Sequence, residues 1–142
     1  MIKFVLASHG KLAEGMRDSV SLILGESIEL YTICAYTQGS EDVTEEIERL
    51  FDTFDEKDEI IVMTDLFGGS VSSAFARLMQ KRKFWLVAGF SLGLVVDIML
   101  IQDEEHIERE IETAIENARD LMRFYNPLLQ HANKPVDTSE LE

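Results

Sequence analysis

Short apolar runs alternate with helix-like segments along most of this chain. Four runs have the length and continuity of strands buried on both faces of a sheet, at residues 2–7, 28–35, 60–63 and 84–88. Between and after them, apolar residues at helical spacing, or in one case an apolar stretch of ten residues, predict helices that begin near Leu12, Val43, Ser70, Leu92 and Ile107. This alternation predicts a mainly parallel sheet with right-handed crossovers.

The expected fold class is α/β, a three-layer sandwich of the flavodoxin-like or Rossmann-like kind, with helices on both faces of about four strands. The chain has 142 residues, which fits one domain able to bury a core without disulfides. We place that domain at residues 1–126 and a polar tail at residues 127–142. The last long helix is expected to include Met122 and to end at Pro127, because proline interrupts helices.

The net charge of −14 is concentrated in two segments. Residues 41–59 contain ten acids and two bases, residues 103–120 contain eight acids and two bases, and the remainder is neutral. Both segments are predicted helices, so we interpret the charge as solvated faces that keep the protein soluble, with a cationic partner as the alternative. Nucleic acid is not expected as a partner, because binding its phosphates needs basic patches.

Cysteine content and hydropathy predict a soluble cytoplasmic protein. Cys34 is the one cysteine and cannot form an internal disulfide, so we interpret it as a small buried hydrophobic residue in a reducing compartment. The N-terminal apolar run ends before Ser8, which is too short for a signal peptide. The longest apolar stretch, residues 92–101, is interrupted by Gly93 and Asp97, so no membrane span is expected.

The tripeptide Ser8-His9-Gly10 stands where the first strand should leave the sheet. In open parallel sheets, ligands and chemistry collect at this carboxyl edge. His9 is therefore a candidate functional residue, and Gly10 would relax the backbone for a tight turn. The alternative is that His9 merely fills that turn.

A second polar break follows the third strand and reads Asp65-Leu66-Phe67-Gly68-Gly69-Ser70. If strands one and three are neighbours, Asp65 emerges beside His9, where its carboxylate would fix the ring's tautomer and leave the other nitrogen its lone pair. The two glycines and a helix start at Ser70 would offer backbone amides and a hydroxyl to an anion. Together these parts predict a histidine that accepts a phosphoryl group, although each part alone is common.

These two motifs resemble the enzyme IIA component of the mannose family of the bacterial phosphoenolpyruvate:sugar phosphotransferase system (PTS). The order of elements and the segment 87–92 before an apolar helix are also similar, over roughly residues 1–125. The resemblance implies that His9 takes a phosphoryl group from the phosphocarrier HPr on Nε2 and passes it to the IIB component. It further implies that Asp65 orients the ring and that Gly68, Gly69 and Ser70 bind the phosphate.

The resemblance also implies a cytoplasmic homodimer, with a C-terminal antiparallel strand exchanged between subunits and only indirect contact with the membrane components IIC and IID. Neither metal nor cofactor is expected, since phosphoryl transfer depends mostly on positioning and charge stabilisation. Leu66, Phe67 and Phe90 are candidates for docking the two partners, with core packing as the alternative. Ser91 and Gly93 stand where family members often have Asn and Pro, and the short tail implies a IIA subunit that is not fused to IIB.

Other functions remain open from the sequence. A phosphoryl-donor subunit of a PTS-dependent dihydroxyacetone kinase is similar to IIA in both motifs. A receiver domain would need two acids after the first strand to hold magnesium, where Ser8-His9 stands. A flavin or nucleotide carrier would need an anion loop at that point, and a metal-dependent hydrolase would need ligand spacing linking His9 to His106 or His131, which the sequence lacks.

Overall fold

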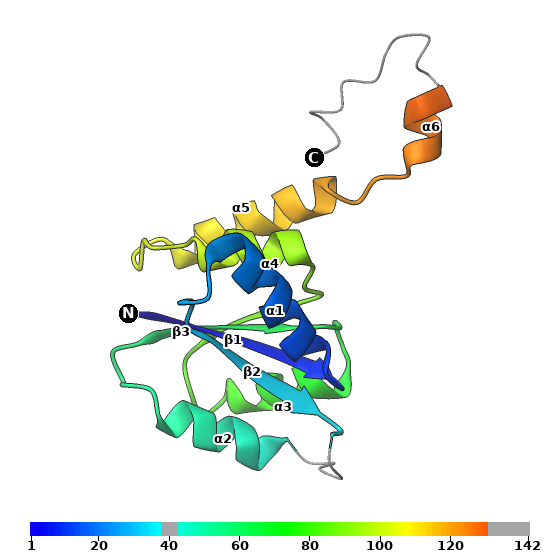
Figure 1. Cartoon of the computed structure of the whole chain (residues 1–142). Coiled ribbons are helices and arrows are strands. Elements are labelled where there is room, and N and C mark those ends of the chain that lie inside the picture. Colours follow the sequence, from blue (N-terminus) through cyan, green and yellow to red (C-terminus); the bar gives the residue numbers. More distant parts are fainter. Residues whose placement is uncertain (38–42, 131–142) are drawn as a thin grey trace.

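The computed structural model describes residues 1–37 and 43–130 (Figure 1). Its sheet has four parallel strands in the order β2-β1-β3-β4, with bounds β1 (Ile2–His9), β2 (Leu30–Ala35), β3 (Glu59–Thr64) and β4 (Trp85–Ala88). The described helices are α1 (Leu12–Leu24), α2 (Thr44–Asp52), α3 (Ser70–Leu78), α4 (Leu92–Met99), α5 (Ile107–Asp120) and α6 (Tyr125–Gln130). The predicted α/β class and parallel sheet are confirmed.

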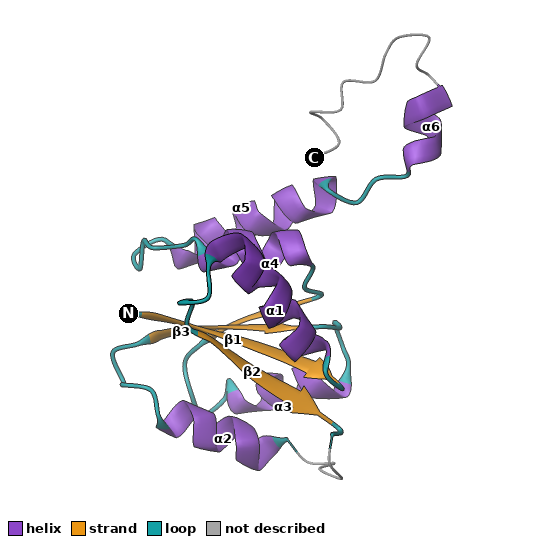
Figure 2. Cartoon of the chain, viewed as in Figure 1, coloured by secondary structure: helices purple, strands orange, loops and turns teal. Residues whose placement is uncertain are grey.

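Helices cover both faces of the sheet (Figure 2), which is why the middle residues of its central strands are apolar on both faces. Side chains of β1 alternate between two cores because successive residues of a strand point to opposite faces. Phe4 and Leu6 pack in the core formed with α1, α4 and α5, whereas Val5 and Ala7 pack in the core formed with α2 and α3. The resulting three-layer sandwich holds β1 and β3 at its centre.

The C-terminal part differs from the sequence-based expectation. Helix α5 ends at Asp120 and does not include Met122, and Pro127 does not end a helix but lies in the first turn of the separate helix α6. Proline is compatible with that position, because the first amides of a helix have no partner within it. Helix α6 buries no residue and projects away from the sandwich (Figure 1).

No antiparallel strand occurs in residues 1–37 and 43–130, where residues 125–130 are helical, and residues 131–142 lie outside the described part. The exchange of a C-terminal strand and the domain boundary at residue 126 therefore stay predictions. Within the described residues, no helix has the length and apolar character needed to cross a bilayer.

Ser91 and Gly93 have structural roles at the start of α4. The Ser91 hydroxyl oxygen accepts a hydrogen bond from the amide of Leu94 at 3.3 Å and so caps the helix. At Gly93, a Cβ atom would lie 2.9 Å from Leu121 Cδ1. Glycine at this position therefore lets the start of α4 approach the end of α5.

Candidate functional site

The strand order places His9 and Asp65 side by side at the carboxyl edge of the sheet. His9 is the last residue of β1, Asp65 directly follows β3, and these two strands pair from Ile2 opposite Glu59 to Ala7 opposite Thr64. One carboxylate oxygen, Asp65 Oδ2, accepts hydrogen bonds from both the backbone amide and ring Nδ1 of His9, each at 2.9 Å. The prediction that these residues, 56 positions apart, meet at one edge is therefore confirmed.

The contact at Nδ1 fixes the tautomer of the imidazole, and the contact at the amide holds the same carboxylate against the His9 backbone. Because the carboxylate only accepts hydrogen bonds, Nδ1 must hold the proton, and Nε2 of a neutral ring keeps its lone pair. The side chain of Asp65 is 8% exposed, whereas the side chain of His9 is 36% exposed. The ring thus has a buried anchor at Nδ1 and an accessible nucleophilic atom at Nε2.

The turn between β1 and α1 explains the residues on either side of His9. The buried Ser8 hydroxyl accepts a hydrogen bond from the amide of Ala13 at 2.8 Å and donates to the carbonyl of Gly10 at 3.1 Å. Gly10 has a φ of +60°, a left-handed conformation that glycine adopts without steric cost. Ser8 and Gly10 therefore shape the turn that presents His9, and they have no direct role at the ring nitrogens.

The loop from Leu66 to Ser70 passes directly beside the imidazole. At Gly69, a Cβ atom would lie 3.3 Å from His9 Cε1, tighter than most real contacts. Gly68 has a φ of +74°, and the Ser72 hydroxyl holds the loop by donating to the carbonyls of Leu66 at 2.9 Å and Gly69 at 3.1 Å. Glycine is thus needed here for a left-handed turn and for close approach to the ring.

Ser70 is the first residue of α3, as predicted, and its Oγ lies 3.2 Å from His9 Nε2. Backbone amides in the first turn of a helix have no partner within that helix and bear a positive partial charge. Ser70 therefore places a hydroxyl and a helix N-terminus next to the nucleophilic nitrogen.

Tyr36 also lies in the site, and the sequence analysis did not single it out. Its ring stacks on His9, with centroids 5.6 Å apart and planes inclined by 23°, and its hydroxyl lies 2.6 Å from Ser70 Oγ. Tyr36 follows β2, the other neighbour of β1. The carboxyl-edge rule that indicated Asp65 applies equally to this strand, so the signal was present in the sequence.

The three docking candidates lie in different surroundings. Leu66 is 57% and Phe67 is 93% exposed. Phe67 and Gly68 border a hollow of about 250 Å³ whose other lining residues come from α3 and β4. Phe90 lies at the same edge through its amide, which donates to the carbonyl of Thr64, but its side chain is half-buried against the core. Leu66 and Phe67 are thus the accessible apolar side chains of the three.

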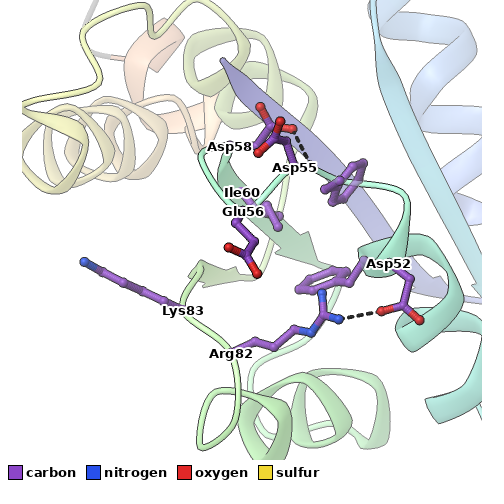
Figure 3. A pocket seen from close by; sticks show the side chains of 9 residues that line it. Asp52, Asp55, Glu56, Asp58, Ile60, Arg82 and Lys83 are labelled. Atoms are coloured by element: carbon purple, nitrogen blue, oxygen red, sulfur yellow. Dashed lines mark hydrogen bonds and ion pairs between the residues drawn. The ribbon is translucent and has the colours of Figure 1, made fainter.

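A larger pocket, of about 450 Å³, lies at the opposite edge of the sheet (Figure 3). Its lining comes from the segments that precede β3 and β4, including Asp52, Asp55, Arg82 and Lys83. Figure 3 shows Arg82 reaching to Asp52, with which it forms an ion pair. No group of three potential metal ligands among His, Cys, Asp and Glu occurs in the described part of the chain. The larger of these two hollows thus lies away from His9 and Asp65, and we base the candidate site on the side-chain contacts and not on the volume of a pocket.

Comparisons with known proteins identify the family. The model of the EIIA-man family, PTS system fructose IIA component, matches residues 3–115. The chain is 27% identical to the sorbose-specific EIIA component of Klebsiella pneumoniae over 107 residues, 75% of this chain and 76% of that one. It is 21% identical to the fructose-specific EIIA component of Bacillus subtilis over 105 residues, 72% of each.

A solved structure from Klebsiella pneumoniae, a candidate phosphoenolpyruvate-dependent sugar PTS permease, has a TM-score of 0.82 and 36% identity, covering 90% of this chain and 93% of that one. The fold and the sequence therefore agree, and the family model spans most of the chain. The chain belongs to the EIIA-man family, the IIA components of the fructose and mannose type that serve as phosphotransfer subunits of the bacterial sugar phosphotransferase system.

Proposed function

We propose that His9 is the phosphoryl-accepting residue of this IIA component, and that Nε2 takes the group from phosphorylated HPr and passes it to the IIB component. The observation that supports this most directly is the 2.9 Å contact between His9 Nδ1 and Asp65 Oδ2. It commits the proton to Nδ1 and so leaves Nε2 ready to attack phosphorus.

The transfer needs no external co-reactant. The Nε2 lone pair forms a new phosphorus–nitrogen bond while the bond to the donor histidine breaks, and that electron pair returns to the donor nitrogen. Positive charge that develops on the His9 ring is offset by the carboxylate of Asp65, which keeps its hydrogen bond to Nδ1 throughout. Because donor and acceptor are both imidazoles, the same steps in reverse deliver the group to IIB.

The segment from Gly68 to Ser70 is the proposed phosphate cradle. Amides at the start of α3 and the Ser70 hydroxyl would donate to the equatorial oxygens of the transferred group. Support comes from two distances: Ser70 Oγ lies 3.2 Å from Nε2, and only glycine fits at position 69 without crowding the ring. The cradle would hold the phosphorus in line between the two imidazoles.

The partners would dock on the surface around His9. Leu66 and Phe67 offer exposed apolar side chains in the loop that passes the ring, a feature of interface centres, and Phe90, which is half-buried, is proposed as the third docking residue. The same proposal places the protein in the cytoplasm as a homodimer, and it gives the membrane components IIC and IID contact only through IIB.

The direct test is incubation with phosphoenolpyruvate, enzyme I and HPr. We expect one phosphoryl group per chain, stable in alkali and lost in acid, as a phosphoramidate bond requires. His9→Ala should abolish labelling, whereas the matched variant His106→Ala should keep it. Labelling that survives the loss of His9 would show that the assignment is wrong.

A chase with acceptors separates the two downstream roles. The labelled chain is mixed either with a IIB component or with the subunits of a dihydroxyacetone kinase. We expect IIB to remove the label within seconds and the kinase subunits to leave it in place, because the relatives are sugar-specific components. Transfer to the kinase alone would assign the chain to that system.

A further inference from the structure

We propose that Tyr36 is a positioning residue for phosphoryl transfer at His9: its hydroxyl aims the Ser70 hydroxyl, and its ring holds the plane of the imidazole. This inference rests on the proposed function, in which His9 Nε2 is the atom that accepts the phosphoryl group. It adds a third strand end to the site: His9 is the last residue of β1, Asp65 directly follows β3, and Tyr36 directly follows β2.

The backbone brings Tyr36 to the imidazole in a fixed way. His9 pairs with Ala35 in the sheet, and the amide of Gly10 donates to the carbonyl of Ala35 at 2.8 Å, which locks the end of β2 to the β1 turn. Tyr36 then adopts a φ of +61°, a left-handed conformation that a bulky residue rarely takes. Such outliers cluster at functional sites, where surrounding contacts offset the strain.

The hydrogen bonds in this corner have a definite direction. Nδ1 donates to Asp65, so Nε2 of the neutral ring accepts, and the Ser70 hydroxyl 3.2 Å away must donate to it. Because the single hydroxyl proton of Ser70 points to Nε2, Ser70 Oγ can only accept in its second contact. The Tyr36 hydroxyl, 2.6 Å away, must therefore donate to it. The order is therefore Tyr36 to Ser70 to His9, which strengthens Ser70 as a donor.

This order gives Tyr36 a role when the phosphoryl group arrives. Once Nε2 has bonded to phosphorus, it no longer accepts a hydrogen bond, and the Ser70 hydroxyl is released to donate to a phosphoryl oxygen. Tyr36 continues to donate to Ser70 Oγ and so keeps that hydroxyl beside Nε2 during the exchange. Without it, Ser70 could rotate away, and the oxygen would lose its donor.

The aromatic ring contributes separately from the hydroxyl. Asp65 holds the His9 ring at one nitrogen only, so the ring could still rotate about that contact. Neighbouring groups must therefore fix the plane of the ring. Tyr36 covers one face with nearly parallel planes, and Gly69 lies against the Cε1 edge. An aromatic face within about 6 Å also stabilises a cation, and the His9 ring becomes cationic as the phosphoryl group transfers.

A purely structural role is a poor explanation for these contacts. Tyr36 is 50% exposed and belongs to neither of the two buried clusters. Tyr31, on the strand β2 that precedes Tyr36, offers a matched control: it is half-buried, and its ring packs edge-on against Phe54, with centroids 5.1 Å apart. Loss of the Tyr36 hydroxyl should therefore leave the fold intact.

The test measures the rate of His9 phosphorylation with two donors, phospho-HPr and the small molecule phosphoramidate. Phosphoramidate transfers its phosphoryl group to Nε2 with loss of ammonia and needs no docking surface. We expect Tyr36→Phe to slow both reactions about fivefold, the size expected for one neutral hydrogen bond, and Tyr36→Leu to slow them about 20-fold. Tyr31→Phe should change neither rate.

A double-mutant cycle with Ser70→Ala separates positioning from a general loss of structure. If Tyr36 acts through Ser70, adding Tyr36→Phe to Ser70→Ala should change the rate by less than twofold, because the two losses overlap. In NMR spectra, Tyr36→Leu should shift the ring protons of His9 through loss of the stacked ring, while Tyr36→Phe should not.

The outcomes distinguish this inference from the proposed function. Absence of labelling of the wild-type chain by phospho-HPr would end the proposed function, and the phosphoramidate arm would still test Tyr36. Wild-type rates for Tyr36→Phe and Tyr36→Leu with both donors would overturn the role of Tyr36 alone. Additive effects of Tyr36→Phe and Ser70→Ala would overturn the order of hydrogen bonds.

Discussion

His9 and His106 each place ring Nδ1 against an aspartate oxygen, at 2.9 Å from Asp65 Oδ2 and 2.6 Å from Asp103 Oδ2. The first pair joins two strand ends 56 positions apart, with a buried carboxylate. The second is a local turn at the start of α5, and both of its partners are about half exposed. A histidine paired with an aspartate therefore occurs twice, once at the junction of two strands with a buried carboxylate and once as an exposed contact on the surface.

The surroundings separate the two histidines further. Beside His9 lie a glycine loop, the Ser70 hydroxyl, the N-terminus of α3 and the ring of Tyr36. His106 is flanked in sequence by Glu104, Glu105 and Glu108, which would repel an anionic phosphoryl donor. His106 also stands at the start of a helix, so a carboxylate partner and a helix N-terminus together do not make a phosphoryl acceptor. The two histidines differ in the glycine loop and the hydroxyl beside His9 and in the acidic residues beside His106.

The largest expected difference in phosphorylation rate is between substitutions of the two aspartates. Asp65→Asn should lower the rate of phosphorylation by phospho-HPr on the order of 100-fold, because the neutral amide cannot offset the charge on the His9 ring and its NH2 group can donate to Nδ1 and so favour the wrong tautomer. Asp103→Asn should leave the rate unchanged. Timed labelling of both variants checks this, and equal rates for the two would remove the distinction between the pairs.

The next effect concerns the glycine loop. Gly69→Ala should slow phosphorylation about tenfold, since the added Cβ would lie 3.3 Å from His9 Cε1 and displace the ring. Gly15→Ala is the matched control: it adds the same methyl group in α1, where no atom lies within 4 Å. Both rates are measured with phosphoramidate, and a normal rate for Gly69→Ala would argue that the close approach has no role.

A smaller effect is expected from the apolar rim, which His9 has and the acidic neighbourhood of His106 does not. Phe67→Ser should raise the KM for phospho-HPr about fivefold and leave kcat and the phosphoramidate rate unchanged, because it removes docking contact only. Leu22→Ser, on an equally exposed residue of α1, is the control. A fall in kcat with unchanged KM would place Phe67 in the chemistry.

The smallest effect is a pKa shift at the surface pair. The hydrogen bond from His106 holds the pKa of Asp103 below its usual 3.8. His106→Ala should therefore raise the pKa of Asp103, as followed by NMR titration of its carboxyl carbon. Any stability from this contact is present above the unfolded-state pKa and is lost as the pH falls through the lowered value. An unchanged pKa would show that the contact does not persist in solution.

The sequence predicted the centre of the site because parallel strands end at one edge of a sheet, on the condition that strands one and three are neighbours, and the structure shows that they are. Apolar runs and intervening helices predicted a parallel sheet, and that sheet brings His9, Asp65 and Ser70 to one edge. Tyr36 was missed although it directly follows β2 at the same edge, because the carboxyl-edge rule was applied only to strands one and three and the contact of Tyr36 depends on a left-handed backbone. Such a conformation is set by neighbouring strands, not by local preference.

The C-terminal part could not be predicted for a different reason. Apolar residues continue at helical spacing beyond Asp120, so periodicity alone extends α5 as far as Met122. In the structure, Leu121 and Met122 are exposed and α5 has already ended. Periodicity indicates which residues would lie on one face of a helix. The length of the helix also depends on whether the rest of the protein packs against that face.

The most direct measurement is the position of the phosphoryl group in the ¹⁵N-histidine-labelled chain after reaction with phospho-HPr. The account predicts one phosphorylated histidine, His9, with phosphorus bonded to Nε2 and a proton on Nδ1, and an unmodified His106. A phosphoryl group on Nδ1 of His9, or on His106 in place of His9, would contradict it.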